Sequence, residues 1–268
     1  MLTIHAAALL LPGGGRAPVP DGAVAVQDAV IAAFGPYGDV AAAHPAARVR
    51  RWPGVLTPGL LQRDAVRLLE ESYFPDPREA DTLGTEPLTG AALDALGPVW
   101  SSGAGEGAAS GAVGSKAEEG VDAERRRLTT TPEATVPDAV TPRGNSRQDL
   151  GPDGTRRAGS VRRGLHRMLR HGTTAATAAP TTPPALITAM RRSGLLVTVA
   201  PAHSGGTARL DPLAGAGAVE GAMAAPLTVG GRADLAAFDV PDEDALLAAG
   251  GASCLATVAA GRLVYRGR

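Results

Sequence analysis

A long stretch in the middle of the chain has almost no large apolar side chains, and it divides the sequence into two parts that can fold. Residues 98–160 contain seven Val or Leu residues, one Trp, and no Ile, Met, Phe or Tyr. Ordering one residue costs roughly 1–2 kcal/mol of conformational free energy, and so few apolar groups cannot offset that cost. We therefore predict a disordered insertion at residues 98–160.

The part before the insertion begins with short strands. In residues 1–58, apolar and polar residues alternate in LTIHA and AVAVQ, and Gly-Pro turns interrupt the runs. This pattern is typical of a small antiparallel β unit. Residues 60–69 then carry Leu and Val at spacings that favour a short helix.

The part after the insertion alternates between helices and strands. From Val161, VRRGLHRMLRHG predicts a helix, TTAATA a strand, PPALITAMRRSG a second helix and LLVTVAP a second strand. Near the C-terminus, ADLAAFDV, SCLATVAAG and RLVYRG predict strands, with a hairpin turn at Gly261-Arg262. The predicted fold class is therefore mixed α/β.

The composition of the chain limits the kinds of partner and the cellular compartment that we expect. The formal net charge of −1 lacks the basic excess of a dedicated nucleic-acid-binding protein, and no run of 18 apolar residues predicts a membrane span. The single cysteine, Cys254, allows neither an intrachain disulfide nor a cysteine-based zinc site. We expect a cytoplasmic protein that binds neither nucleic acid nor membrane.

Two segments at opposite ends of the chain carry a family resemblance. GAVAVQDAVIAAFGPYGDVAAAHPAARVRRWPGVLTPGLL resembles the N-terminal part of the amidohydrolase superfamily, in particular the imidazolonepropionase and aminodeoxyfutalosine deaminase type. LTVGGRADLAAFDV with CLATVAAGRLVYRGR is similar to the closing strands of the same family. The resemblance covers residues 20–61 and 226–268, and more weakly 161–200. It implies a composite β-sandwich beside a TIM-like barrel, and hydrolysis of non-peptide C–N bonds.

The resemblance also implies a domain division. Residues 1–58 and 215–268 would form the composite β-sandwich, and residues 59–97 and 161–214 an α/β remnant of the barrel. Of the 167 residues between Pro58 and Pro226, 63 belong to the insertion, which leaves 104. A full barrel needs about 250 residues, so we expect only two or three βα units.

The metal site implied by the resemblance is incomplete in this sequence. Family members carry an H-x-H metal pair shortly after the P-G of the strand end, and the matching positions are Asp64 and Val66. Asp64 can donate an oxygen, whereas Val66 can donate nothing. His203, after a strand end, and Asp211, in an Asp-Pro sequence that also favours a turn, complete the predicted ligand set. No residue is assigned a catalytic role.

Two functional interpretations follow. In the first, the protein is a C–N hydrolase whose cofactor is zinc, held by Asp64, His203 and Asp211. In the second, favoured by the missing H-x-H pair, the protein is catalytically degenerate and has no cofactor. It would then be a scaffold that binds a ligand or a partner. A homodimer formed through the barrel remnant would cover its open strand edges.

Overall fold

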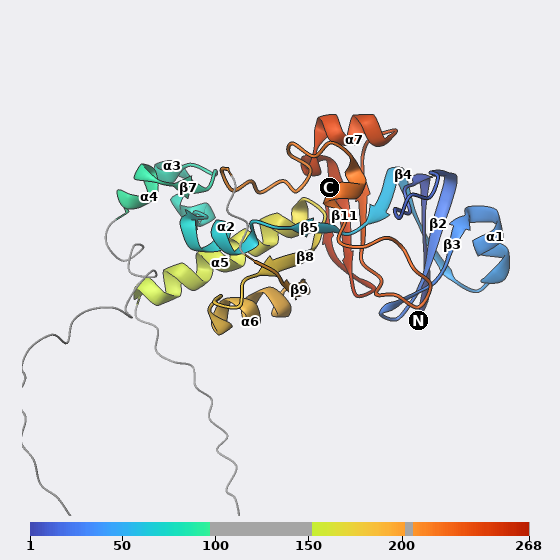
Figure 1. Ribbon diagram of the computed structural model, residues 1–268, viewed down its shortest axis with the longest axis horizontal. Coiled ribbons are helices and arrows are strands. Elements are labelled where there is room, and N and C mark those ends of the chain that lie inside the picture. The colour runs from blue at the N-terminus through green and yellow to red at the C-terminus, as the bar shows by residue number, and fades with distance from the viewer. Residues whose placement is uncertain (97–151, 202–205, 268) are drawn as a thin grey trace, which may run out of the picture.

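The computed structural model describes residues 1–96, 152–201 and 206–267. A seven-stranded mixed sheet lies beside a three-stranded parallel sheet and its helices (Figure 1), which confirms the predicted mixed α/β class. Most of the predicted insertion, residues 98–151, lies outside the described residues. Its last part, residues 152–160, is helical, and the prediction of disorder was wrong there.

The large sheet is built from both ends of the chain. Its strand order is β12–β11–β10–β4–β1–β2–β3, and β10 pairs antiparallel with β4, so the C-terminal strands extend the N-terminal sheet. This pairing of the two ends agrees with the resemblance. The strands are β1 (Leu2–Leu10), β2 (Val19–Gln27), β3 (Val30–Pro36), β4 (Arg48–Pro58), β10 (Leu235–Phe238), β11 (Cys254–Ala259) and β12 (Arg262–Arg266).

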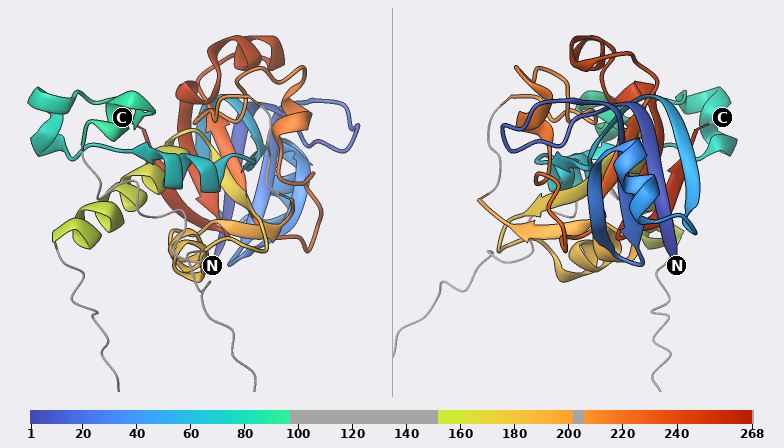
Figure 2. Two further views of the ribbon diagram at one scale, coloured as in Figure 1. Left: turned by 60° about the vertical axis from the view of Figure 1, so that its left-hand side comes forward. Right: turned by 90° about the vertical axis from the view of Figure 1, so that its right-hand side faces the viewer.

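One hydrophobic core contacts all seven strands of this sheet. Both edge strands contribute to it, Ile31 from β3 and Leu263 from β12, so the sheet curls around the core (Figure 2). Residues 229–233 run along the edge strand β3, where the amide of Ile31 donates to the carbonyl of Gly231 at 2.9 Å. The residues predicted to form a composite sandwich thus belong, in the described part of the chain, to one curved sheet.

The turn between β2 and β3 places a residue other than glycine at a positive φ. Asp28 has a φ of 55°, whereas Ala29 has no positive φ, so the strained position falls on the residue type that tolerates it better. The N-terminal amino group also pairs with the Asp28 carboxylate at 2.6 Å. Asp234 has a structural role, because it accepts hydrogen bonds from Arg232 and from the amide of Ala260.

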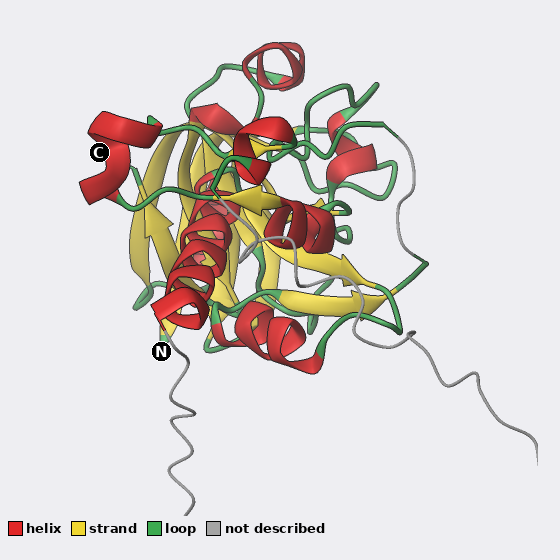
Figure 3. Ribbon diagram, turned by 90° about the vertical axis from the view of Figure 1, so that its left-hand side faces the viewer, coloured by secondary structure: helices red, strands yellow, loops and turns green. Residues whose placement is uncertain are grey.

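The second sheet contains three parallel strands in the order β5–β8–β9. They are β5 (Leu60–Gln62), β8 (Thr173–Ala178) and β9 (Leu196–Val199), and helices α2 (Ala65–Glu71), α5 (Pro152–Arg170) and α6 (Pro184–Arg192) pack against them (Figure 3). The described residues form no closed barrel, and the interpretation of this unit as a barrel remnant stays a prediction. Leu60 and Leu61, expected in a helix, lie on β5 instead.

Helix α5 begins nine residues before its predicted start at Val161. Polar contacts hold this first half, which is why a count of apolar residues missed it. Ser160 is fully buried and its hydroxyl accepts a hydrogen bond from the amide of Phe74 at 2.9 Å. Arg156 donates to the hydroxyl of the buried Tyr73 at 3.0 Å.

Smaller elements surround the two sheets. Helix α1 packs through Val40 on the face of the large sheet opposite the curved core. In the ranges that the structure describes, no helix is long and apolar enough to cross a membrane. The remaining elements are α1 (Tyr37–Ala43), α3 (Ala80–Leu83), α4 (Ala91–Asp94), α7 (Glu243–Ala249), the hairpin of β6 (Ser72–Tyr73) and β7 (Leu88–Thr89), and short 3-10 helices at Pro77–Glu79, Val219–Ala222 and Gly251–Ser253.

The two sheets are in direct contact. The hydroxyl of Thr257 on β11 donates to the carbonyl of Leu169 on α5 at 2.6 Å, and both groups are buried. This bond ties the large sheet to the helix that covers the small one. The domain boundaries inferred from the sequence stay a prediction.

A buried histidine in the large sheet gives a pH-dependent contribution to stability. His5 on β1 is 2 % exposed, and its ring stacks on Trp52 at a centroid distance of 6.1 Å. The indole N–H of Trp52 donates to Nδ1 of His5 at 3.4 Å. Burial, with a smaller contribution from the charge of Arg50, lowers the pKa of His5 to about 4.

We expect the free energy of unfolding to decrease as the pH falls from about 6.5 to about 4. Over that window the unfolded histidine binds a proton that the folded one does not, a difference on the order of 3 kcal/mol at full extent. Urea unfolding at pH 7, 5 and 4 measures it. His5→Asn keeps an acceptor for Trp52 but cannot titrate, so the free energy of unfolding of this variant should change little with pH over this range. His44→Asn is the control. Equal pH profiles for wild type and His5→Asn would contradict the assignment.

Candidate functional site at the strand ends

The carboxyl ends of β5, β8 and β9 point to the same side of the small sheet, because the three strands are parallel. Loops at this end of a βα barrel form its active site. A cavity of about 270 Å³ lies at the end of β5 and brings together two of the three predicted metal ligands, Asp64 and Asp211. Its lining consists of Leu61, Gln62, Arg63, Asp64, Gly206, Thr207, Arg209, Asp211, Pro212 and Ala214.

Gln62 is the residue that attaches the segment 206–214 to the strand end. Its side chain is buried, and its amide nitrogen donates to the carbonyls of Arg209 and Leu210 at 3.0 and 2.9 Å. Its amide oxygen accepts from the backbone amide of Asp64 at 3.0 Å. All three contacts are to backbone, so Gln62 has a structural role in this cavity.

Asp64 lies at the start of α2, and both of its carboxylate oxygens have partners. One oxygen is 3.5 Å from Arg67 and the other accepts from the backbone amide of Arg209 at 3.4 Å. The side chain is only 14 % exposed. The carboxylate therefore lies between a cation and a backbone donor, with both contacts at the long end of the hydrogen-bond range.

Asp211 also uses both carboxylate oxygens. One accepts from the amide of Leu213 two residues later at 2.9 Å, as in an Asp-Pro turn. The other accepts from the amide of Gly251 at 2.9 Å and so anchors the segment to the start of a short helix. These contacts agree with the turn-forming role that its sequence also favours.

Arginines add positive charge around the strand end. The guanidinium of Arg63 donates to the carbonyl of Gly221 at 3.1 Å, and that of Arg67 donates to the carbonyl of Gly206 at 3.0 Å. Like Gln62, both side chains hold the segment that crosses the strand ends. Positive charge beside the cavity disfavours a second cation there.

The described residues do not fit a zinc site. Zinc sites in proteins use three or four nitrogen, sulfur or oxygen ligands. Within residues 1–96, 152–201 and 206–267, no group of three or more His, Cys, Asp or Glu side chains could hold a metal ion. His203, the third predicted ligand, lies outside the described residues, and Val66 on α2 offers no donor.

The sequence analysis missed the residues that shape this cavity. Gln62, Arg63 and Arg67 come shortly after the T-P-G-L sequence at the strand end. This position was the only feature of the sequence that could have indicated a role for them. Polar residues at the carboxyl end of a barrel strand invite a catalytic interpretation. Their backbone contacts to residues more than 100 positions away could be found only in the folded chain.

Comparison with known proteins gives weak likenesses. No protein-family model and no curated protein matches the chain. Among solved structures, Helicobacter pylori aminofutalosine deaminase is 22 % identical over 24 % of this chain and 16 % of its own, with a TM-score of 0.22. A. niger ochratoxinase and Bradyrhizobium japonicum guanine deaminase are each 16 % identical over 74 % of this chain and 31 and 34 % of their own, with TM-scores of 0.35 and 0.34. The chain thus spans between 16 and 34 % of the length of these proteins.

We expect Gln62→Leu to destabilise the protein by about 2–3 kcal/mol, because it leaves the carbonyls of Arg209 and Leu210 without their donor. Segment 206–214 should also detach locally, so trypsin should cleave after Arg209 faster than in wild type. Urea unfolding and timed proteolysis with mass spectrometry measure the two effects. Gln27→Leu, at the exposed end of β2, is the matched control. Unchanged cleavage after Arg209 in Gln62→Leu would rule out the anchoring role.

Proposed function

We propose that this protein is an amidohydrolase-like scaffold that does not hydrolyse C–N bonds and instead binds a ligand or a partner. One observation carries the proposal: the polar side chains at the end of β5 are committed to holding segment 206–214. Gln62, Asp64 and Asp211 each place their polar side-chain atoms on backbone amides, carbonyls or an arginine.

The chemistry of metal-dependent hydrolysis supports this interpretation. A catalytic zinc keeps one open position for water and takes three protein ligands with free lone pairs. Asp64 is paired with Arg67, and the Asp211 oxygens accept from two amides. Each carboxylate already helps to hold the segment that forms one wall of the cavity, and two carboxylates alone fall short of the three protein ligands of a catalytic zinc.

The competing function is the C–N hydrolase that the resemblance implies, with zinc held by Asp64, His203 and Asp211. Metal content of the purified protein, measured by mass spectrometry, separates the two. We expect well under one zinc per chain, and no ammonia release above background from cyclic amides, amidines and aminopurines. About one zinc per chain, lost in both His203→Ala and Asp64→Asn, would establish the hydrolase site and refute the scaffold.

A second candidate is self-association, and the exposed edge of the small sheet favours it. Strand β9 is an edge strand, and its residues Leu196 and Val199 are 41 and 70 % exposed. An open strand edge with apolar side chains is a template for pairing with another strand. Two copies related by a two-fold axis would join their β9 strands antiparallel and continue the sheet from one copy to the next.

We expect a dimer by light scattering coupled to size exclusion at micromolar concentration. Val199→Lys places a charge in the paired edge and should shift the mass to that of a monomer. Val229→Lys, a loop valine with 61 % exposure, is the matched control and should leave the dimer intact. A monomeric wild type, or equal effects of the two variants, would refute pairing through β9.

A further inference from the structure

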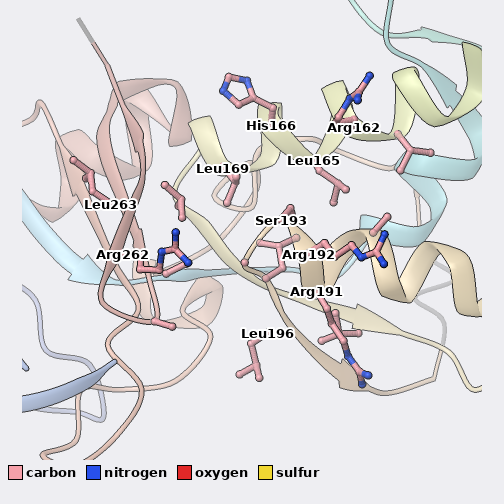
Figure 4. A pocket seen from close by; sticks show the side chains of 18 of the residues that line it. Arg162, Leu165, His166, Leu169, Arg191, Arg192, Ser193, Leu196, Arg262 and Leu263 are labelled. Carbon is pink, nitrogen blue, oxygen red and sulfur yellow. The ribbon is translucent and has the colours of Figure 1, made fainter. Parts of the chain in front are cut away.

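A groove of about 1090 Å³ lies at the opposite end of the small sheet, where β9 begins (Figure 4). It runs between α5, the end of α6, and the turn that joins β11 to β12. The strand-end cavity uses the carboxyl end of β5, so the two cavities share no lining residue. A binding function of the groove therefore does not depend on the presence of a catalytic site at the strand ends.

The floor of the groove is aliphatic. Leu196 is 41 % exposed, and the partly exposed Val161, Val197 and Leu263 continue the apolar surface. Leu165, Leu169 and Leu195 also line the groove but are only 3, 6 and 3 % exposed, because they belong to the protein's own core. The exposed apolar surface is complementary to the apolar stripe of a second helix.

The rim of the groove is cationic. Arg162 and His166 lie on α5, Arg191 and Arg192 end α6, and Arg262 begins β12 (Figure 4). No lining residue is Asp or Glu. Within the described ranges, none of these four arginines forms an ion pair, whereas Arg232, which also lines the groove, is paired with Asp234. The free cations call for an anionic occupant.

We propose that this groove binds an acidic amphipathic helix of a partner protein. The lining residues on α5 run from Ala158 to Leu169, which is about 16 Å, or three turns of a helix lying alongside. An apolar stripe would cover the leucine floor, and acidic side chains at its edges would pair with arginines on both sides. This is the helix-in-groove mode of recognition, with the charges setting orientation and partner choice.

The chemistry of the groove disfavours other occupants. A second copy seated by a two-fold axis would bring two arginine rims together, and like charges repel. Single-stranded nucleic acid needs aromatic side chains for stacking, and the lining has none beyond His166. An amphiphile with one anionic head would neutralise one or two of the four arginines, whereas a helix with several carboxylates can pair with all of them.

Three synthetic peptides of about 15 residues test the proposal, each with Leu at i, i+3 and i+4 positions. The remaining positions are Glu in the first, Gln in the second and Lys in the third. Fluorescence anisotropy measures their binding to the full chain. We expect the Glu peptide to bind tightest, to become helical on binding by circular dichroism, and to weaken as salt rises.

Matched variants locate the site. The triple variant Arg191→Gln, Arg192→Gln, Arg262→Gln should weaken the Glu peptide about tenfold, because each rim pair contributes up to about 1 kcal/mol. Arg48→Gln, Arg50→Gln, Arg78→Gln removes the same charge elsewhere and should change the affinity less than about twofold. Leu196→Asp, at a side chain that is 41 % exposed, should weaken binding through the floor. All three should unfold in urea like wild type.

Four results would overturn the proposal. The first is equal binding of the Glu and Lys peptides, and the second is an equal effect of the groove and control variants on the affinity. The third is binding of dodecanoate in the groove by a protein that does not bind the Glu peptide. The fourth is a groove variant that breaks up a self-associated form of the protein and leaves binding of the Glu peptide unchanged. The last two would identify an amphiphile or a second copy as the occupant.

Discussion

The structure depends on one residue where the chain crosses from the large sheet to the small one. The amide of Gly59 donates to the carbonyl of Asp234, and its own carbonyl accepts from the amide of Ala224, both at 2.9 Å. A Cβ at this position would lie 1.9 Å from the hydroxyl oxygen of Thr174 on β8. Only glycine lets three distant segments meet here, so the T-P-G-L motif is a constraint on packing before it is a sign of any chemistry.

This crossing explains why the strand-end residues are structural. Segment 206–228 passes over the end of β5, contacts Gly59 through Ala224 and leads into β10, and its loops need hydrogen-bond partners. Gln62, Asp64 and the neighbouring arginines supply them. In a complete barrel, further strands would flank this end and share that task. With three strands, the residues that a catalytic site would use also hold the wall together.

The sequence predicted the parts of the fold that repeat a local pattern. The sequence pattern located β8 and the C-terminal hairpin, although the turn of the hairpin lies at Ala260-Gly261 and not at the predicted Gly261-Arg262. The two terminal segments paired as the resemblance implies. The first half of α5 was missed because Ser160 and Arg156 hold it through polar contacts that apolar counts do not register. Asp64 and Asp211, predicted as metal ligands from their positions, both line the strand-end cavity, and their role as ligands stays a prediction. Their hydrogen bonds could not be predicted, because the partners come from loops without periodicity.

Arginine has two different roles in this chain, and its partners distinguish them. Around the strand ends, Arg63 and Arg67 donate to backbone carbonyls, and their charge is part of the fold. Around the groove at the other end, Arg191, Arg192 and Arg262 have no acidic neighbour among the lining residues. The net charge of −1 is a sum over these two groups of arginines and over acidic segments such as the start of α7. It therefore excludes only partners that need a uniformly basic surface. A structural role does not explain why these arginines surround an aliphatic surface in the groove. An acidic amphipathic helix would pair with the arginines and cover the aliphatic surface.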